Sequence, residues 1–192
     1  VRKKIFYLQN IFNHEKVLKE EFVRGTAEWQ GAEKELKSIL KSGKKIRRME
    51  GYDVSNIQDE FAVGAMSVFF DGKPMKSEYR KFKIRFRAKD DLSRLKEVLE
   101  RRFKRREWPL PGLILIDGGK AHLNLLKKII IESKFQKRVR LIALAKAEET
   151  IYTDRGEILN LKKYPKIYSF LAFLRDEAHR FALRYHQKIR KS

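Results

Sequence analysis

Residues 113–120 read Leu-Ile-Leu-Ile-Asp-Gly-Gly-Lys, four apolar residues followed by an acid, two glycines and a lysine. The apolar run predicts a short buried strand, and the helical pattern of residues 120–133 predicts that the chain then turns into a helix. Residues 139–145 form a second buried-looking strand, and strands joined by a helix usually pair in parallel. Asp117 would then lie at the carboxyl end of a parallel strand, where open α/β sheets bind their ligands.

Upstream of this unit, the hydrophobic pattern is that of an antiparallel meander. Residues 46–56 and 61–70 are predicted strands with a tight turn at 58–60, and the second run is apolar at nearly every position, as in a central strand. Asp71-Gly72 is a strong hairpin signal. Over residues 81–87 apolar and basic side chains alternate, which indicates a strand with one face in the core.

The first part of the chain has a helical pattern. Residues 14–41 repeat apolar positions at helical spacing, and Gly25 is expected to break it. Stop signals and a charge run in residues 41–45 indicate a boundary, so we expect a helical lead-in over residues 1–45 and one domain over residues 46–192. Three further elements are expected: a helix that Asp90-Asp91 caps and that ends near residue 106, a hairpin within residues 150–161, and a closing helix over about 169–189.

The composition indicates the class of partner. The 192 residues contain 46 lysines and arginines against 25 acids, a formal net charge of +21, which attracts polyanions. The charge is spread over strands, helices and loops rather than along one amphipathic helix, so nucleic acid is favoured over a membrane surface. No cysteine is present and no apolar run is long enough to span a bilayer, which favours a cytoplasmic protein.

Three side chains stand out as metal ligands. Asp53, Asp117 and His179 each lie in an apolar run, where a lone charge is costly unless a metal ion or hydrogen bonds compensate it. Two carboxylates from neighbouring strands would leave coordination positions for water and phosphate oxygens, an arrangement suited to phosphodiester hydrolysis. Arg175 precedes His179 by four residues, so both lie along one side of the closing helix.

Each of these residues also has a purely structural interpretation. Asp53 could initiate a turn, Asp117 could cap the helix that begins near Lys120, and His179 could be satisfied by a backbone carbonyl. The Gly-Gly-Lys of residues 118–120 is not a phosphate-binding P-loop, because the earlier glycine of that motif is absent, so nucleotide hydrolysis is disfavoured.

Five motifs in order resemble the C-terminal endonuclease domain of the UvrC excinuclease family, from bacterial nucleotide excision repair. They are M-E-G-Y-D-V-S-N at 49–56, F-A-V-G-A-M-S-V-F-F-D-G-K-P at 61–74, S-E-Y-R-K-F-K-I at 77–84, L-I-L-I-D-G-G-K at 113–120 and R-D-E-A-H-R-F-A-L at 175–183. The resemblance covers about residues 46–190. It departs from the family at Asp59, where the family usually has Gly, and at Ala121-His122, where it often has Gly-Gln.

The resemblance implies a mixed α/β, RNase H-like fold with a five-stranded mixed sheet of strand order 3-2-1-4-5 and helices on both faces. It implies a DNA endonuclease of DNA repair and the SOS response that makes the 5′ incision, with Asp53, Asp117 and His179 as the catalytic and metal-binding residues and Mg²⁺ or Mn²⁺ as the cofactor. The implied partners are double-stranded DNA with a lesion, nick or bubble, and a complex of UvrB with DNA.

Other charged residues are candidates for supporting roles. Glu50, Asp176 and Glu177 could lie next to the metal ligands, although the last two are also expected as ordinary helix-surface charges. Candidate DNA contacts are Lys120, Arg175 and Arg180 near the scissile bond, and Lys81, Lys83, Arg85, Arg87, Arg101, Arg102, Lys104, Arg105 and Arg106 as non-specific phosphate contacts.

Two other functions fit the same sequence. One is a different RNase H-like enzyme, such as a junction resolvase or a transposase-type nuclease. The other is a DNA-binding module without catalysis. The family's N-terminal nuclease domain, its segment for docking UvrB and its tandem helix-hairpin-helix are missing, so a lone domain is expected to bind DNA weakly and to cut poorly.

Overall fold

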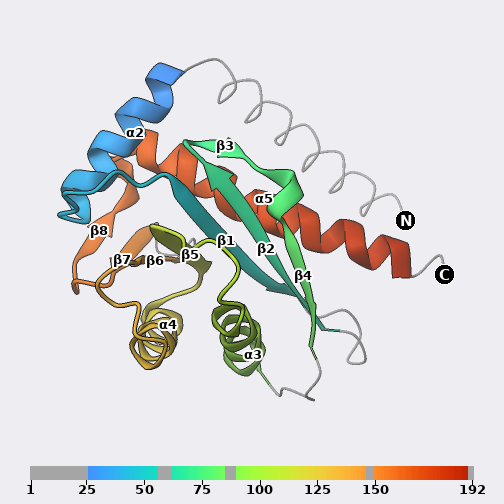
Figure 1. The fold of residues 1–192 in the computed structure, drawn as a ribbon. Coiled ribbons are helices and arrows are strands. Elements are labelled where there is room, and N and C mark those ends of the chain that lie inside the picture. Colours follow the sequence, from blue (N-terminus) through green and yellow to red (C-terminus); the bar gives the residue numbers. More distant parts are fainter. Residues whose placement is uncertain (1–25, 56–61, 85–89, 146–148, 190–192) are drawn as a thin grey trace.

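The computed structural model describes residues 26–55, 62–84, 90–145 and 149–189 (Figure 1). Within them, one sheet holds eight strands: β1 (Arg48–Ser55), β2 (Val63–Phe70), β3 (Lys73–Pro74), β4 (Arg80–Lys83), β5 (Leu113–Asp117), β6 (Arg140–Ala145), β7 (Thr150–Thr153) and β8 (Ile158–Asn160). The α-helices are α2 (Thr26–Ile39), α3 (Asp91–Lys104), α4 (Lys120–Glu132) and α5 (Pro165–Ile189), and two 3₁₀ turns are η1 (Lys76–Glu78) and η3 (Leu161–Lys163).

The strand order confirms the expected meander followed by crossovers. The sheet runs β3-β2-β1-β5-β6-β7-β8, and β4 pairs with β2 on the same side as β3. β1 pairs with β2 in antiparallel and with β5 in parallel, and β5 pairs with β6 in parallel. The central part therefore has the predicted order 3-2-1-4-5.

The expected count of five strands was wrong. The third strand of the meander is split into β3 and β4, because η1 interrupts it, and the hairpin expected within residues 150–161 adds β7 and β8 beyond β6. The turn expected at residues 58–60 lies outside the described residues.

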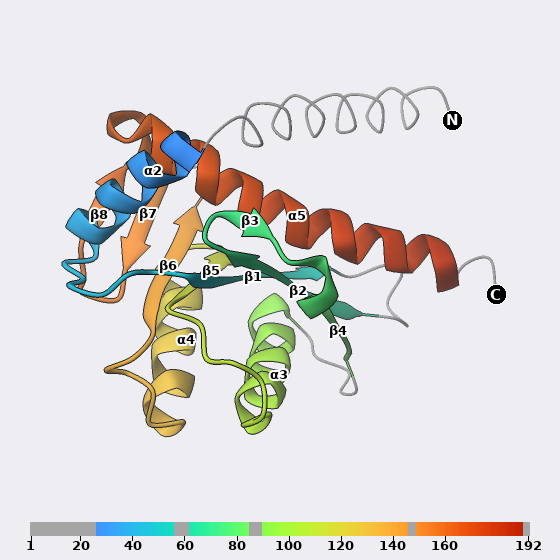
Figure 2. The ribbon, with the colours of Figure 1, turned by 45° about the horizontal axis from the view of Figure 1, so that its top comes forward.

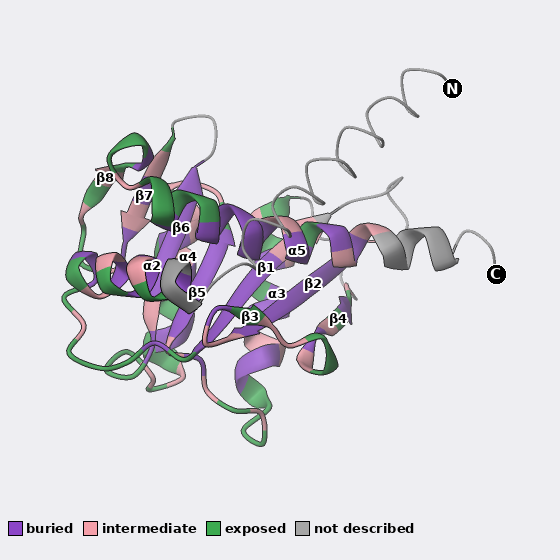
Figure 3. Cartoon of the chain, turned by 90° about the horizontal axis from the view of Figure 1, so that it is seen from above, coloured by how far each residue is buried: buried purple, intermediate pink, exposed green. Residues whose placement is uncertain are grey.

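Two helical layers cover the sheet. Figure 2 shows α5 on one face and α3 with α4 on the other, with α2 beside α5. The central strands are buried along most of their length (Figure 3). Because side chains alternate along a strand, Met49 of β1 packs in the core on the α5 face and Tyr52 in the core on the α3 face. This alternation decides which face each polar residue of β1 occupies.

Local signals fix the ends of several elements. The carboxylate of Asp90 accepts a hydrogen bond from the backbone N–H of Ser93 at 2.7 Å and caps α3, as expected. α5 begins at Pro165, earlier than residue 169, since proline is favoured at the first helical position. None of the described helices is long and apolar enough to cross a membrane.

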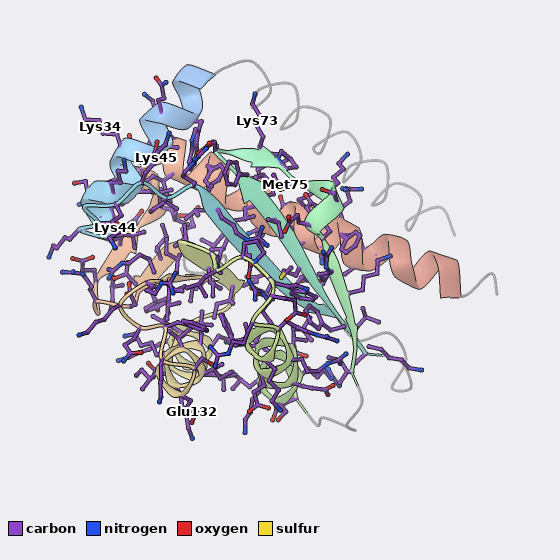
Figure 4. The ribbon with its side chains drawn as sticks, viewed as in Figure 1. Lys34, Lys44, Lys45, Lys73, Met75 and Glu132 are labelled. Carbon is purple, nitrogen blue, oxygen red and sulfur yellow. The ribbon has the colours of Figure 1, made fainter. Side chains whose placement is uncertain are left out.

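The helix α2 packs into the same core as α5. Its residues Trp29 and Leu36 are buried, as is Leu40 just after it, and the Trp29 ring centroid lies 4.7 Å from that of Phe170 on α5. The solvent side of this region is basic: Lys34 on the helix, and Lys44 and Lys45 after it, are exposed at this edge of the molecule (Figure 4). The boundary expected between residues 45 and 46 stays a prediction.

The turn between β2 and β3 provides a test of this docking. Gly72 has φ +80°, and a Cβ there would lie 2.6 Å from the Trp29 ring. Gly72→Ala is expected to lower the free energy of unfolding by about 1–3 kcal/mol for the left-handed backbone, with a further loss from the clash. Gly156→Ala is the matched control, because Gly156 has φ +86° and open space around it. Equal losses in urea unfolding of the two variants would contradict the packing of α2 against this turn.

Candidate active site

Asp53 and Asp117 lie side by side at the carboxyl ends of two neighbouring parallel strands. The register of β1 and β5 pairs Tyr52 with Ile116, so the next residue on each strand is an aspartate. Tyr52 and Ile116 both belong to the core on the α3 face. Because successive side chains alternate, both aspartates are directed to the opposite face, which α5 covers.

The third candidate residue, His179, reaches this edge from α5. Its Nδ1 lies 3.4 Å from Oδ1 of Asp53, although the two residues are 126 positions apart in the sequence. Close packing of α5 on the sheet makes this possible: a Cβ on Gly51 would lie 3.0 Å from the carbonyl oxygen of Leu174, so only glycine fits there without a shift. A glycine two residues before Asp53, inside a predicted strand, is the sequence signal for this close approach.

The environment of Asp53 favours a positively charged neighbour. Its side chain is 12% exposed, and among the residues that the structure describes, its buried Oδ2 has no hydrogen-bond partner. The hydrogen bond to Asp53 raises the pKa of His179; burial opposes this, and the negative charges of Asp53, Asp176 and Asp117 add to it. An unpartnered buried carboxylate oxygen is costly, so the site is suited to a cation.

Asp117 does not cap the helix that follows it. The N-cap of α4 is Gly119, which has no side chain to do so, and Asp117 is the exposed last residue of β5. The chain turns at Gly118, whose φ of +137° and close contact with the His122 ring both require glycine. The capping interpretation of Asp117 is therefore wrong, and so is the turn interpretation of Asp53, which lies within β1.

A hollow of about 200 Å³ opens at this edge of the sheet. Its lining includes Asp53 and Asp117 from the strands, Asp91 from the first turn of α3 and His122 from the first turn of α4. Asp91 and His122 are the polar residues that sequence reasoning did not select. Both residues lie in the first turn of a helix, and this position was their signal in the sequence. α4 follows the carboxyl end of β5, and the start of α3 faces the same edge of the sheet.

The side chains at this site supply two of the ligands that a divalent cation needs. Across the described ranges, no group of three or more histidine and acidic side chains is close enough to hold an ion by itself. Asp53 and Asp117 nevertheless offer carboxylate oxygens from adjacent strands, and hard cations such as Mg²⁺ prefer oxygen ligands and keep several waters. These two residues could hold such an ion, with the remaining positions open to water or phosphate oxygens.

Two arginines of α5 that were expected near the scissile bond are buried and paired. Arg175 donates to Oδ1 of Asp176 from both Nε and Nη2, and Arg180 is paired with Glu177. Glu177 was expected to be a helix-surface charge, and this was wrong. It is buried, and its Oε1 accepts a hydrogen bond of 3.1 Å from the Tyr79 hydroxyl. Burial and the charge of Glu177 raise the pKa of Tyr79 well above its ordinary value.

Glu50 does not support the metal ligands, contrary to expectation. It lies two residues before Tyr52 and therefore on the α3 face, where it is fully buried. Arg102 binds it through Nη2 at 2.8 Å and Nε at 3.0 Å, and the Tyr52 hydroxyl donates to it at 2.6 Å. Arg102 is consequently not a DNA contact, since it is 1% exposed.

The other expected DNA contacts remain on the surface where they are described. Lys81 and Lys83 of β4 are exposed and flank the buried Phe82, as the alternating pattern predicted. Lys120 is the exposed first residue of α4, next to the hollow. Arg85 lies outside the described residues, as does Arg87.

Known families and proteins include clear relatives of this chain. It matches the UvrC RNase H endonuclease domain over residues 37–183. UvrABC system protein C of Dehalococcoides mccartyi is 44% identical over 167 residues, covering 82% of this chain and 27% of that protein. The same-named protein of Aquifex aeolicus is 42% identical over 149 residues, covering 76% of this chain and 26% of that protein. The chain spans about a quarter of the length of these relatives.

Solved structures of Endonuclease V give weaker similarities. Endonuclease V of Ciona intestinalis, in complex with a 24mer DNA containing an inosine followed by a ribo-adenosine, has a TM-score of 0.49 and 16% identity, covering 85% of this chain and 98% of that chain. The catalytic domain of human Endonuclease V has a TM-score of 0.43 and 13% identity, covering 95% of this chain and 96% of that chain.

The matched residues 37–183 include all five motifs from which the resemblance was inferred. Relatives above 40% identity cover most of the chain as well. The chain therefore belongs to the family of UvrC RNase H endonuclease domains and has the RNase H-like fold of that family.

Proposed function

We propose that this domain is a divalent-metal-dependent DNA endonuclease that hydrolyses a phosphodiester bond with Asp53, Asp117 and His179. The observation that supports it most directly is the placement of two aspartates on adjacent parallel strands, on the face that α5 covers with His179. The unpartnered Oδ2 of Asp53 adds to this support, because a cation would satisfy it.

In this proposal Asp53 and Asp117 hold Mg²⁺ or Mn²⁺ through their carboxylate oxygens. When bound, such an ion lowers the pKa of water and offsets negative charge on phosphoryl oxygens. His179 supplies acid–base chemistry. Its Nδ1 is engaged by Asp53, so Nε2 is the atom that would give a proton to the leaving oxygen or take one from the attacking water.

The relatives support an inference about the role of the whole protein. They are UvrABC system C proteins, so we infer that the domain acts on damaged double-stranded DNA, makes the 5′ incision and receives its substrate from UvrB bound to DNA. Lys120, Lys81 and Lys83 are exposed and serve in this proposal as phosphate contacts. Arg175 and Arg180 are paired with acids of the same helix, so this proposal assigns them no DNA contact.

The proposal is tested with metal. A 5′-labelled duplex carrying a nick or bubble is incubated with the chain in Mn²⁺, in Mg²⁺ and in EDTA, and Mn²⁺ binding is measured by calorimetry. We expect cleavage in both metals, none in EDTA, and heat of Mn²⁺ binding that Asp117→Asn abolishes. DNA binding without cleavage in any metal, even after UvrB and a lesion are supplied, would support the non-catalytic binding module instead.

A further inference from the structure

A second cavity lies at the opposite end of the sheet from the aspartates. It has a volume of about 260 Å³ and is formed by the segment between α3 and β5 and by the turn between α4 and β6. Both segments lead into the amino ends of parallel strands, whereas Asp53 and Asp117 lie near the carboxyl ends. The length of β5, five residues at about 3.3 Å each, separates the two sites.

The lining combines cationic and aromatic side chains. Arg105, Arg106 and Arg138 are exposed at the cavity, and Trp108 and Phe135 are half-buried in its wall. The Arg106 guanidinium lies 4.7 Å from the centroid of the Phe135 ring. The backbone N–H of Arg138 donates to the Phe135 carbonyl oxygen at 2.8 Å, so one tight turn holds both residues at the rim.

The charges of this lining are not all neutralised by the protein. Arg102 is bound to Glu50, and Arg105 lies 3.5 Å from Glu107. Among the residues that the structure describes, neither Arg106 nor Arg138 pairs with an acid, and Nη1 of Arg106 donates to the Ser133 carbonyl oxygen at 3.5 Å. Two uncompensated guanidinium groups beside aromatic rings form a site for an anion that also carries a flat apolar group.

We propose that this cavity binds one nucleotide unit of single-stranded DNA, with a phosphate on Arg138 and the base on the guanidinium plane of Arg106, which lies over the Phe135 ring. Basic grooves with aromatic platforms are the usual way in which proteins hold single strands, and guanidinium planes also stack on bases. The volume suits one nucleotide-sized group and cannot admit a duplex. The inference rests on the proposed function, since it gives the nuclease a second contact with an unpaired region of its DNA.

The test is binding of a fluorescein-labelled twelve-residue oligothymidylate to the full chain in EDTA, with a duplex of equal length as comparison. Arg106→Ala and Arg138→Ala are each expected to weaken single-strand binding about fivefold and to reduce the slope of log K against log salt by about one. Arg155→Ala is the matched control. Arg155 is exposed in the turn between β7 and β8, away from the cavity, and its substitution removes the same single positive charge. Equal losses in all three variants would overturn the proposal in favour of general electrostatics.

The base contact is tested separately. Phe135→Leu keeps an apolar side chain but removes the ring, and we expect it to weaken single-strand binding at least about fivefold with little change for the duplex. The tryptophan fluorescence of the chain, to which Trp108 in the cavity wall contributes together with Trp29 in the core, should change on adding the single strand. No effect of Phe135→Leu, or an equal effect on both DNA forms, would overturn the assignment of a base. Because no metal or cleavage is involved, this result is independent of the test of the active site.

Discussion

Asp53→Asn and Asp117→Asn are each expected to lower the metal-dependent cleavage rate by about 10³-fold. Each variant replaces an anionic oxygen ligand with a neutral amide, and metal-ion stabilisation of several kcal/mol converts to this factor at about 1.36 kcal/mol per tenfold. The rate is measured in single-turnover cleavage of nicked or bubble DNA, with Mn²⁺ affinity measured in parallel. The cleavage rate and the Mn²⁺ affinity should fall together in Asp53→Asn and in Asp117→Asn.

The stability of the Asp53 variant distinguishes a functional from a structural role. Since Oδ2 of Asp53 is buried and unpartnered among the described residues, removing the charge is expected to leave the melting temperature of the metal-free protein unchanged or raised. A structural carboxylate would show the opposite, because its hydrogen bonds would be lost.

Asp90→Asn is the matched control for these variants. Asp90 is exposed at the start of α3, and asparagine caps helices as well as aspartate does, so this variant removes one negative charge and keeps the helix. We expect cleavage within about twofold of the unmodified chain, because surface changes typically have small effects. Full activity of Asp117→Asn alongside this control would show that Asp117 is not a ligand.

The largest expected loss of stability comes from the buried cluster on the other face of the sheet. Glu50 accepts hydrogen bonds from Arg48, Arg102 and Tyr52, and both the acid and Arg102 are almost inaccessible to solvent. Burial lowers the pKa of Arg102, but the hydrogen bond and the negative charge of Glu50 outweigh it, so the pKa of the guanidinium stays raised. Glu50 therefore supplies the carboxylate that compensates the buried positive charge of Arg102.

Glu50→Ala is expected to lower the free energy of unfolding by about 3–5 kcal/mol, because it leaves the buried guanidinium of Arg102 without its carboxylate, while Arg48 keeps its ion pair with Glu78. For a chain of this length such a loss corresponds to a fall in melting temperature of about 10 °C or more. Urea unfolding followed by circular dichroism measures it. Lys104→Ala, an exposed change on the same helix as Arg102, should stay within about 0.5 kcal/mol.

A smaller loss of stability in a variant that replaces Glu50 and Arg102 together would support the same explanation. Replacing Glu50 and Arg102 together by apolar residues of similar volume should recover much of the loss, since removing both partners of a buried pair leaves less charge uncompensated than removing one. If Glu50→Ala alone proved as stable as Lys104→Ala, the cluster could not be the buried, fully paired unit that the structure shows.

The local elements and their order could be read from the sequence. Alternation in residues 81–84, the apolar run before Asp117 and the cap at Asp90 correspond to β4, β5 and α3, because each pattern is set by contacts within a few residues. The acids of the candidate site were found for the same reason. A lone charge in an apolar run is visible without knowledge of its partner.

The partners of the charged residues were decided only by the tertiary structure. Glu50 and Glu177 each lie a few positions from a candidate ligand in the sequence, yet Glu50 meets Arg102 across 52 positions and Glu177 meets Tyr79 across 98. Likewise, the helical pattern placed His179 beside the core, but only the packing of α5 over Gly51 brings its ring to Asp53. Periodicity specifies which face of an element is buried, whereas the group that meets a buried charge comes from another element, so it depends on how the layers pack.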